Sequence, residues 1–467
     1  VVAGLHDRLS YSVGRYLFET DGFRENNDFD QSVTNAFVQF RANPDTSFLA
    51  ELRLTDADSG DLQTRFDPEA YIPELRRSEN VDTLRLGMRK NLSSRGTALA
   101  SLQYQDIALS STTGPLFTLT TQSDGYAGDF AHLYDSGRWH LVSGLFILDQ
   151  NRTDVSVLHL DEPLPPGVTP VTVDEYDVRQ TSPYLYATFA GSPALSLTFG
   201  LSADSVEALT YDKERLNPKL GVLWRPTART SVRAAAFRTL QGPLVSRRNI
   251  LPRLEPVQVA GFNQFFFGSE GELATRYGIG VDHAFSERLS GGIEVSERET
   301  ELPLRAEAGP ISADVGDSEE RSHRAYLHWT PSARVAFKAE YERDAFDNGG
   351  GLFNGFSSMK IERLPLEARY FHGSGWSVGI TGTYARQSGY FADSVVIQPD
   401  TTTVYGEDSF WVFDASVGYR LPNRRGLVSL NVANLLDEEF RFQDIDPESP
   451  EFLPDRTIYL RFTLAFD

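Results

Sequence analysis

Apolar and polar residues alternate with a period of two along most of this chain, and no other sequence feature restricts the fold as strongly. Successive side chains of a β-strand point to opposite faces, so each alternating run predicts a strand with one apolar and one polar face. A sheet built from such strands borders two different environments, as the wall of a membrane β-barrel does. Four clear runs place apolar residues at Val335, Phe337, Ala339 and Tyr341, at Leu364, Leu366, Ala368 and Tyr370, at Trp376, Val378, Ile380 and Tyr384, and at Leu460, Phe462, Leu464 and Phe466.

The connections between these runs fall into two classes. Short ones carry turn residues, as in Ala42-Asn43-Pro44-Asp45 and Asp135-Ser136-Gly137-Arg138. Long polar ones alternate with them, at about 56–79, 110–123, 151–177, 241–271, 300–320, 346–358, 388–407 and 443–455. A soluble domain rarely has so many long loops, whereas outer-membrane barrels have short periplasmic turns and long extracellular loops. We therefore predict an all-β fold, a large antiparallel transmembrane β-barrel, with about 20 complete strands of about 10 to 14 residues.

Tryptophan placement supports this interpretation. Four of the five tryptophans, Trp139, Trp224, Trp329 and Trp376, lie within about three residues of a predicted short turn. Indole rings prefer the membrane–water boundary, where the ring is buried and its N–H stays hydrated. These four residues therefore predict one membrane-interface girdle at the short-turn end of the barrel.

The composition excludes several classes of function. A formal net charge of -21 argues against a nucleic-acid partner, because phosphate recognition needs a basic surface. The sequence has no Cys, which excludes disulfides, Cys-ligated metals and thiol catalysis. His323 and His328 would lie on opposite faces of one strand, and no nucleophile–His–acid grouping is recognisable. We predict no catalytic residues, no metal site and no cofactor, so the chain is not expected to be an enzyme.

Two loop motifs are candidates for ligand binding. Phe262, Phe265, Phe266 and Phe267 form an aromatic cluster in a predicted outer loop, where an exposed cluster would contact a ligand or partner. The alternative is that the cluster anchors its loop against its neighbours or inside the barrel mouth. The stretch from Asp56 to Asp61 is similar to the start of a calcium loop, but it lacks the downstream Glu, so we predict a solvated turn.

Several stretches, taken in order, resemble the C-terminal barrel of TonB-dependent outer-membrane receptors. They are VVAGLHDRLSYSV at 1–13, DGFREN at 21–26, NPKLGVLWRP at 217–226, AAFRTLQGP at 235–243, DASVGYRL at 414–421, VANLLDEEF at 432–440 and RTIYLRFTLAF at 456–466. The last stretch resembles the closing strand with its assembly signal, here Tyr459, Phe462, Leu464 and Phe466. Each motif is short, and the resemblance rests on their order and spacing along nearly the whole chain.

The resemblance implies a barrel of about 22 strands that occupies residues 1–467, with the first strands and any plug upstream or absent. It implies a protein of the Gram-negative outer membrane that takes up a scarce, bulky solute: a metal chelate, a cofactor or an oligosaccharide. The alternative is a barrel that serves as an anchor or an export conduit for a periplasmic repeat region or a surface assembly, without TonB-driven import. Expected partners are outer-membrane lipid and lipopolysaccharide, the barrel-assembly machinery, TonB through an unseen N-terminal region, and a surface lipoprotein or periplasmic repeat domain.

Overall fold

The computed structural model describes residues 1–114, 116–159, 169–209, 211–243, 253–264, 270–301, 317–349, 351–352, 354–395, 401–447 and 449–465. The strands are β1 (Val2–His6), β2 (Leu9–Thr20), β3 (Phe29–Asn43), β4 (Thr46–Ser59), β5 (Leu75–Asn91), β6 (Gly96–Thr113), β7 (Phe117–Asp135), β8 (Trp139–Leu158), β9 (Val171–Ser192), β10 (Leu195–Ala208), β11 (Tyr211–Thr227), β12 (Thr230–Leu240), β13 (Gln258–Val259), β14 (Phe262–Asn263), β15 (Leu273–Ser286), β16 (Leu289–Glu301), β17 (Ser318–Ser332), β18 (Val335–Asp347), β19 (Phe356–Phe371), β20 (Trp376–Ala392), β21 (Thr403–Arg420), β22 (Gly426–Ala433) and β23 (Thr457–Leu464). A single 3-10 turn, η1 (Pro422–Arg424), is the one helical element in the described ranges, and none of them holds a helix that could span a membrane.

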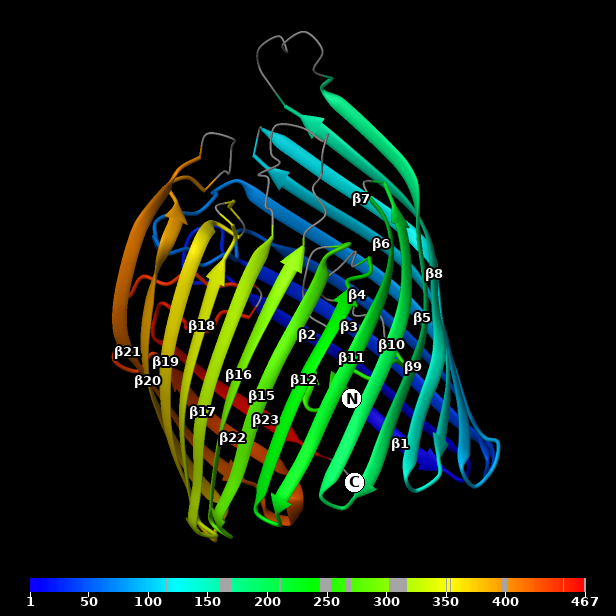
Figure 1. The fold of residues 1–467 in the computed structure, drawn as a ribbon. Helices are drawn as coiled ribbons and strands as arrows, with labels where there is room; N and C mark the ends of the chain where they lie inside the picture. The colour runs from blue at the N-terminus through cyan, green and yellow to red at the C-terminus, as the bar shows by residue number, and fades with distance from the viewer. Residues whose placement is uncertain are drawn as a thin grey trace.

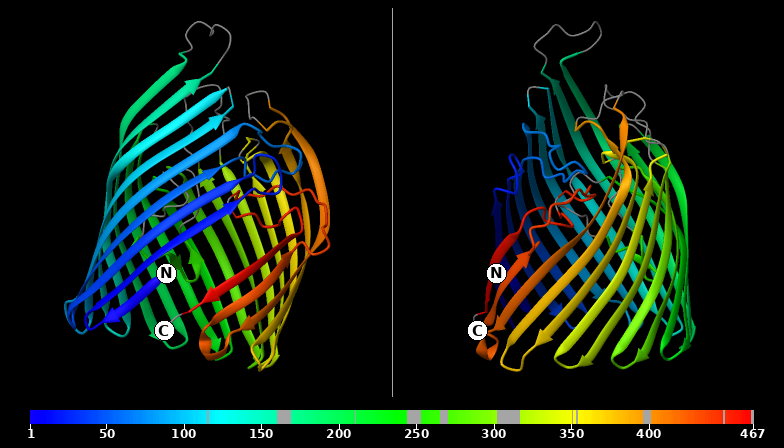
Figure 2. Two further views of the ribbon diagram at one scale, coloured as in Figure 1. Left: turned by 180° about the vertical axis from the view of Figure 1, so that it is seen from behind. Right: turned by 90° about the vertical axis from the view of Figure 1, so that its left-hand side faces the viewer.

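One antiparallel sheet of 21 strands runs from β1 to β23, and each strand pairs with the next along the chain. β13 and β14 lie apart from it as a two-stranded hairpin. The sheet curls round on itself into a wide barrel (Figure 1), and β1 and β23 form its two edges, both running toward the short-turn end (Figure 2). This confirms the predicted fold class: the sheet holds the short β1 and twenty longer strands.

The alternation in the sequence sorts side chains to the two faces of the wall. On β20 the outward-facing Trp376, Val378 and Ile380 are exposed, whereas Ala385 and Gln387, on the other face, are completely buried. The apolar outward side chains form the band that suits lipid, and the inward face is polar or is covered by other parts of the chain.

Short turns and long connections lie at opposite ends of the barrel, as predicted (Figure 1). The strands, however, are longer than predicted. The supposed loop at 110–123 consists mainly of β6 and β7, which pair up to Thr113 and Phe117. Ser and Thr residues continue the ladder beyond the apolar band, and the Thr112 and Thr118 hydroxyls lie 3.3 Å apart across it. β-branched Thr favours extended backbone, so polarity here marked the end of the lipid-facing band and not the end of the strand.

Buried apolar residues form separate clusters on the inner face of the wall. One cluster joins loop residues to β19, β20 and β21, and a second holds the β13–β14 hairpin against β9, β12 and β15. Both clusters lie where connections of the long-loop end fold back into the barrel.

Candidate functional site at the mouth and in the lumen

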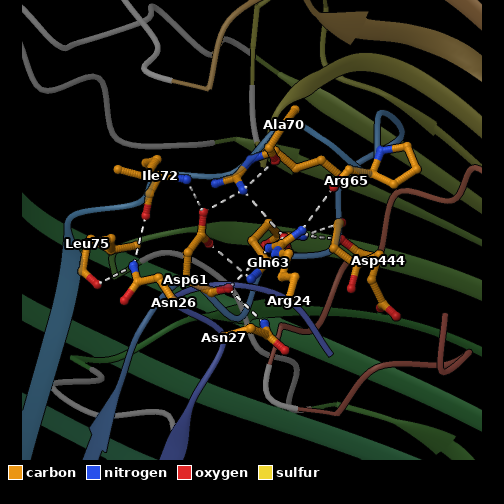
Figure 3. A network of polar contacts seen from close by, with 12 residues as sticks. Arg24, Asn26, Asn27, Asp61, Gln63, Arg65, Ala70, Ile72, Leu75 and Asp444 are labelled. Carbon is orange, nitrogen blue, oxygen red and sulfur yellow. Dashed lines mark hydrogen bonds and ion pairs between the residues drawn. The ribbon is translucent and has the colours of Figure 1, made fainter. Parts of the chain in front are cut away.

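Three connections meet at the mouth of the barrel. They are 21–28 between β2 and β3, 60–74 between β4 and β5, and the β22–β23 connection, described over 434–447 and 449–456. Their contact centres on Asp61, which is 1% exposed (Figure 3). Its carboxylate accepts hydrogen bonds from Arg65 Nη1 at 2.6 Å, the Ile72 backbone N–H at 2.9 Å and the Gln63 backbone N–H at 3.1 Å. The prediction of a solvated turn is therefore wrong for Asp61, since backbone from its own loop folds over the carboxylate.

The same network joins the loops to one another. Arg24 Nη2 donates to the backbone carbonyls of Gln63 at 2.8 Å and Asp61 at 3.1 Å. Gln63 Nε2 donates to the carbonyl of Asp444 at 2.6 Å, so the 60–74 loop is joined directly to the β22–β23 connection (Figure 3). Burial lowers the pKa of the Arg24 guanidinium, while Asp61 opposes the shift. Burial also raises the pKa of the Asp444 carboxyl, although backbone N–H donors from Glu451 and Asp446 oppose this.

Aromatic packing fixes these loops to the inner wall. Phe66 stacks on Phe391 of β20 with ring centroids 4.2 Å apart, and Phe440 stacks on Phe410 of β21 at 4.3 Å. Phe442 and Phe452 complete the cluster at right angles to Phe410. Polar pairing reinforces the contact, because the side chain of Gln387 donates to the Gln443 carbonyl at 2.9 Å and accepts from its N–H at 2.7 Å. This side of the mouth is thus a fixed wall, and it connects the first strands of the sheet to the last ones.

Residues 253–264, which belong to the connection between β12 and β15, lie inside the lumen. Val259 and Phe262 of the β13–β14 hairpin are buried against Tyr184, Tyr186 and Phe237. A Cβ built on Gly221 would lie 2.9 Å from Val259 Cγ1, and one built on Gly278 would lie 2.3 Å from Phe262 Cε1. These two wall positions therefore need glycine because the hairpin occupies the space that a side chain would fill. Full burial of Phe262 and Val259 stabilises the docked hairpin by about 1.5–3 kcal/mol each.

Charged and polar groups also join the hairpin to the wall. Tyr186 donates its hydroxyl to Glu255 Oε1 at 2.6 Å, and Lys219 Nζ lies 3.9 Å from the same oxygen. Arg253 pairs with the other Glu255 oxygen at 2.8 Å. Asp129 accepts from the backbone N–H of the neighbouring Leu254 and from Tyr184 at 2.9 Å. Lys219 and Asp129 are each 2% exposed, so wall charges and hairpin charges compensate one another in a largely dry contact.

The depth of the hairpin follows from the strand register. Gly221, Ala235 and Gly278 are cross-strand neighbours and lie at one level of the wall. That level is five residues below Leu240, the outer end of β12, which corresponds to about 17 Å along the strand. It is also five residues above Thr230, the short-turn end of the same strand. The hairpin therefore contacts the wall well inside the lumen, about midway along β12.

Of the four predicted contact residues, the structure describes only Phe262. Phe262 is 2% exposed, so it anchors its segment and offers no exposed surface to a partner. This burial favours the anchoring alternative for Phe262, and its role as a contact remains a prediction. Phe265, Phe266 and Phe267 lie outside the described residues, so their role as contacts remains a prediction.

The predicted girdle residues all lie on the outward surface near short turns. Trp139 and Trp376 begin β8 and β20, and Trp224 and Trp329 come three residues before the ends of β11 and β17. Their exposed fractions lie between 42% and 50%. Three of them pack on a neighbouring strand: Trp139 on Phe189, Trp329 on Phe337 and Trp376 on Tyr419. Their contact with a membrane boundary remains a prediction.

The predicted assembly signal lies on the edge strand β23. Phe462 and Leu464 share one face of β23, and Tyr459 points to the other, because it is separated from them by odd numbers of residues. All three are exposed, and Phe466 lies outside the described residues. A role in barrel assembly remains a prediction for all four.

Sequence reasoning missed the residues that build the interior. Lys219 stands in a strand with several other charged residues, and Glu255 stands in a loop, with no local pattern to link them. The available signal was a charged residue on the polar face of a strand, which does not single out Lys219. Within the described part of the chain, no group of three or more His, Asp or Glu side chains could hold a metal ion. The arrangement offers a shaped mouth and a partly filled lumen, which suit binding and passage.

Comparisons with known proteins agree with this architecture. A family model described as TonB dependent receptor-like, beta-barrel, matches residues 5–295. A search of curated proteins finds no match.

Three solved structures share the fold. The ferripyoverdine receptor of Pseudomonas aeruginosa is similar at 15% identity and a TM-score of 0.68, with 98% of this chain and 68% of that one covered. The E. coli ferric-catecholate import receptor Fiu in its closed form has 13% identity, a TM-score of 0.68 and coverage of 99% and 78%. The P. aeruginosa ferric enterobactin receptor has 14% identity, a TM-score of 0.69 and coverage of 99% and 76%. Identities this low show that the fold is shared, and they carry no information about which ligand is bound.

Proposed function

Because the chain belongs to the TonB-dependent receptor-like β-barrel family, we propose that it forms the outer-membrane wall of a receptor that imports a scarce, bulky solute. The observation that carries the proposal is the family match over 5–295. The continuous 21-stranded sheet, with short turns at one end and long loops at the other, supports it. Family members are receptors and transporters that work with TonB, and they are not enzymes. Outer-membrane location follows from the family, and contacts with lipopolysaccharide, the assembly machinery or a surface lipoprotein remain predictions.

The solute class that we propose is a ferric chelate. The three structures with the same fold are named for ferripyoverdine, ferric catecholate and ferric enterobactin. The alternative of an anchor or export conduit gains no support from these comparisons. A chelate is also consistent with a wide, polar-lined lumen that has no built metal site in the described residues.

The charge of the mouth narrows the class further. In each of the three mouth loops, acidic residues outnumber basic ones, and the whole chain carries a net charge of -21. Two like unit charges about 10 Å apart in water repel by about 0.4 kcal/mol. A trianionic ferric tris-catecholate that faces even one net negative charge therefore binds about 1.2 kcal/mol less favourably, which weakens binding nearly tenfold in Kd. We propose that the solute is a neutral or cationic ferric chelate.

Binding of chelates that differ in charge tests this proposal. The full-length protein, purified in detergent, would be titrated by fluorescence quenching with a neutral ferric trihydroxamate, a cationic ferric trihydroxamate and a trianionic ferric tris-catecholate. We expect the first two to bind at least about tenfold more tightly than the third at low salt. The difference should shrink as salt screens the mouth. Tighter binding of the trianion would overturn the charge assignment, and no binding of any chelate would overturn the ferric-chelate class.

A further inference from the structure

The β13–β14 hairpin lies inside the passage that a solute would take. We propose that residues 253–264 form a resident lumen ledge, which stays docked on the wall while solute passes and confines the passage to the remaining side of the barrel. This inference rests on the proposed function, because it concerns the path of the imported solute. It assigns a path-setting role to a segment that the sequence marked only as part of an outer loop.

Shape complementarity supports permanent docking. The wall has glycine at Gly221 and Gly278, where Val259 and Phe262 sit, and a larger residue at either position would collide with the hairpin. Arg233 adds a third contact, with its guanidinium 5.1 Å from the centroid of the Phe262 ring. If the hairpin left the wall in each transport cycle, water would reach the two hollows at Gly221 and Gly278. It would also reach the rings of Tyr184, Tyr186 and Phe237.

Charge complementarity between the hairpin and the wall also supports permanent docking. Lys219 and Asp129 face inward from the wall, and Glu255 and the Leu254 backbone N–H lie against them. Each of these side chains is at least nine-tenths buried in the docked state. Lys219 also donates to Ser202 Oγ at 2.9 Å and to the Asn217 carbonyl at 3.1 Å, which fixes its ammonium in place for Glu255.

The opposite side of the ledge faces the lumen and is not covered by the described residues. Val257 is 59% exposed, and Gln258 and Asn263 are exposed and joined by a hydrogen bond of 2.8 Å across the hairpin. These three side chains form the surface that a passing solute would meet. The hairpin thus has a dry face toward the wall and a face toward the lumen that the described residues leave exposed.

Labelling during transport tests whether the ledge moves. The natural chain has no Cys, so a Val259→Cys variant carries a single thiol, which lies on the buried face of the hairpin. In cells that express the full chain, we expect a small maleimide to label this thiol at the same slow rate with and without a saturating ferric trihydroxamate. Faster labelling while the chelate is taken up would overturn the proposal.

A second measurement does not depend on uptake. In a Val259→Cys variant, the buried thiol should react slowly with a small maleimide, and adding Gly278→Ala should accelerate labelling, because the new methyl displaces the Phe262 ring. Gly128→Ala is the matched control, since its Cβ would meet nothing closer than 3.3 Å. Rapid labelling of Val259→Cys without Gly278→Ala would refute docking. If the protein imports no chelate, the proposed function fails, and the labelling rates still decide whether the ledge is docked.

Discussion

Removing the Asp61 carboxylate should release the 60–74 loop from the mouth without unfolding the barrel. This carboxylate is 1% exposed and accepts from Arg65, Gln63 and Ile72. Breaking a buried, hydrogen-bonded ion pair by removing one partner costs about 3–5 kcal/mol. If that cost is confined to the loop, the Asp61→Ala variant raises its opening equilibrium by about two to three and a half orders of magnitude.

Hydrogen exchange followed by mass spectrometry measures this opening. Peptides that cover Gln63 and Ile72 should lose protection in Asp61→Ala, and peptides from the centres of β6 and β7 should keep theirs. Asp67→Ala is the matched control in the same loop, because Asp67 is exposed and its carboxylate accepts a local hydrogen bond from the Glu69 N–H at 3.2 Å. Unchanged protection in the loop, or an equal loss in the barrel strands, would refute the reasoning.

Three further predictions concern the ledge, the outer surface and pH. Phe262→Ala should undock the ledge at a cost of about 3–5 kcal/mol, seen as faster exchange of 254–264 with an unchanged barrel melting transition; an unchanged exchange rate would contradict the docking contact. Asp106 lies directly opposite Asp82 and Asp124 on neighbouring strands, so Asp106→Asn should stabilise the barrel by about 0.5–1 kcal/mol in a denaturant titration at low salt, and destabilisation would contradict it. Burial raises the pKa of Asp444, so its contribution to loop docking is fully present below the ordinary Asp pKa and is lost as pH rises through the raised value. Intrinsic-rate-corrected protection of 440–447 should fall across that window in the natural protein and stay flat in Asp444→Asn; a flat profile in both would contradict it.

The wall of the barrel could be predicted from the sequence because its information is local. Alternation along a single strand, as at Trp376, Val378 and Ile380, specifies which side chains face lipid without reference to any distant residue. Turn residues such as Gly137, with φ of 83°, mark the hairpins equally locally. Strand ends were harder to predict. Thr112 and Thr118 look like loop residues in sequence, but they extend a ladder above the membrane band.

The interior could not be predicted, because its contacts join distant parts of the chain. Asp129, Lys219 and Glu255 come from β7, β11 and a loop, and only the register of intervening strands brings them together. Asp61 was misassigned for a related reason. A run of acidic residues reads as solvated surface, and the sequence gives no sign that Arg65 and the Ile72 backbone will fold over one carboxylate.

The central claim is that this chain is the wall of a TonB-dependent importer. Uptake of radioactive iron from a neutral ferric trihydroxamate by cells that express the full-length protein, with and without a functional tonB gene, tests it most directly. The account predicts saturable uptake that is lost when TonB is removed, while the barrel remains folded in the outer membrane. Uptake that continues at the same rate without TonB would contradict it.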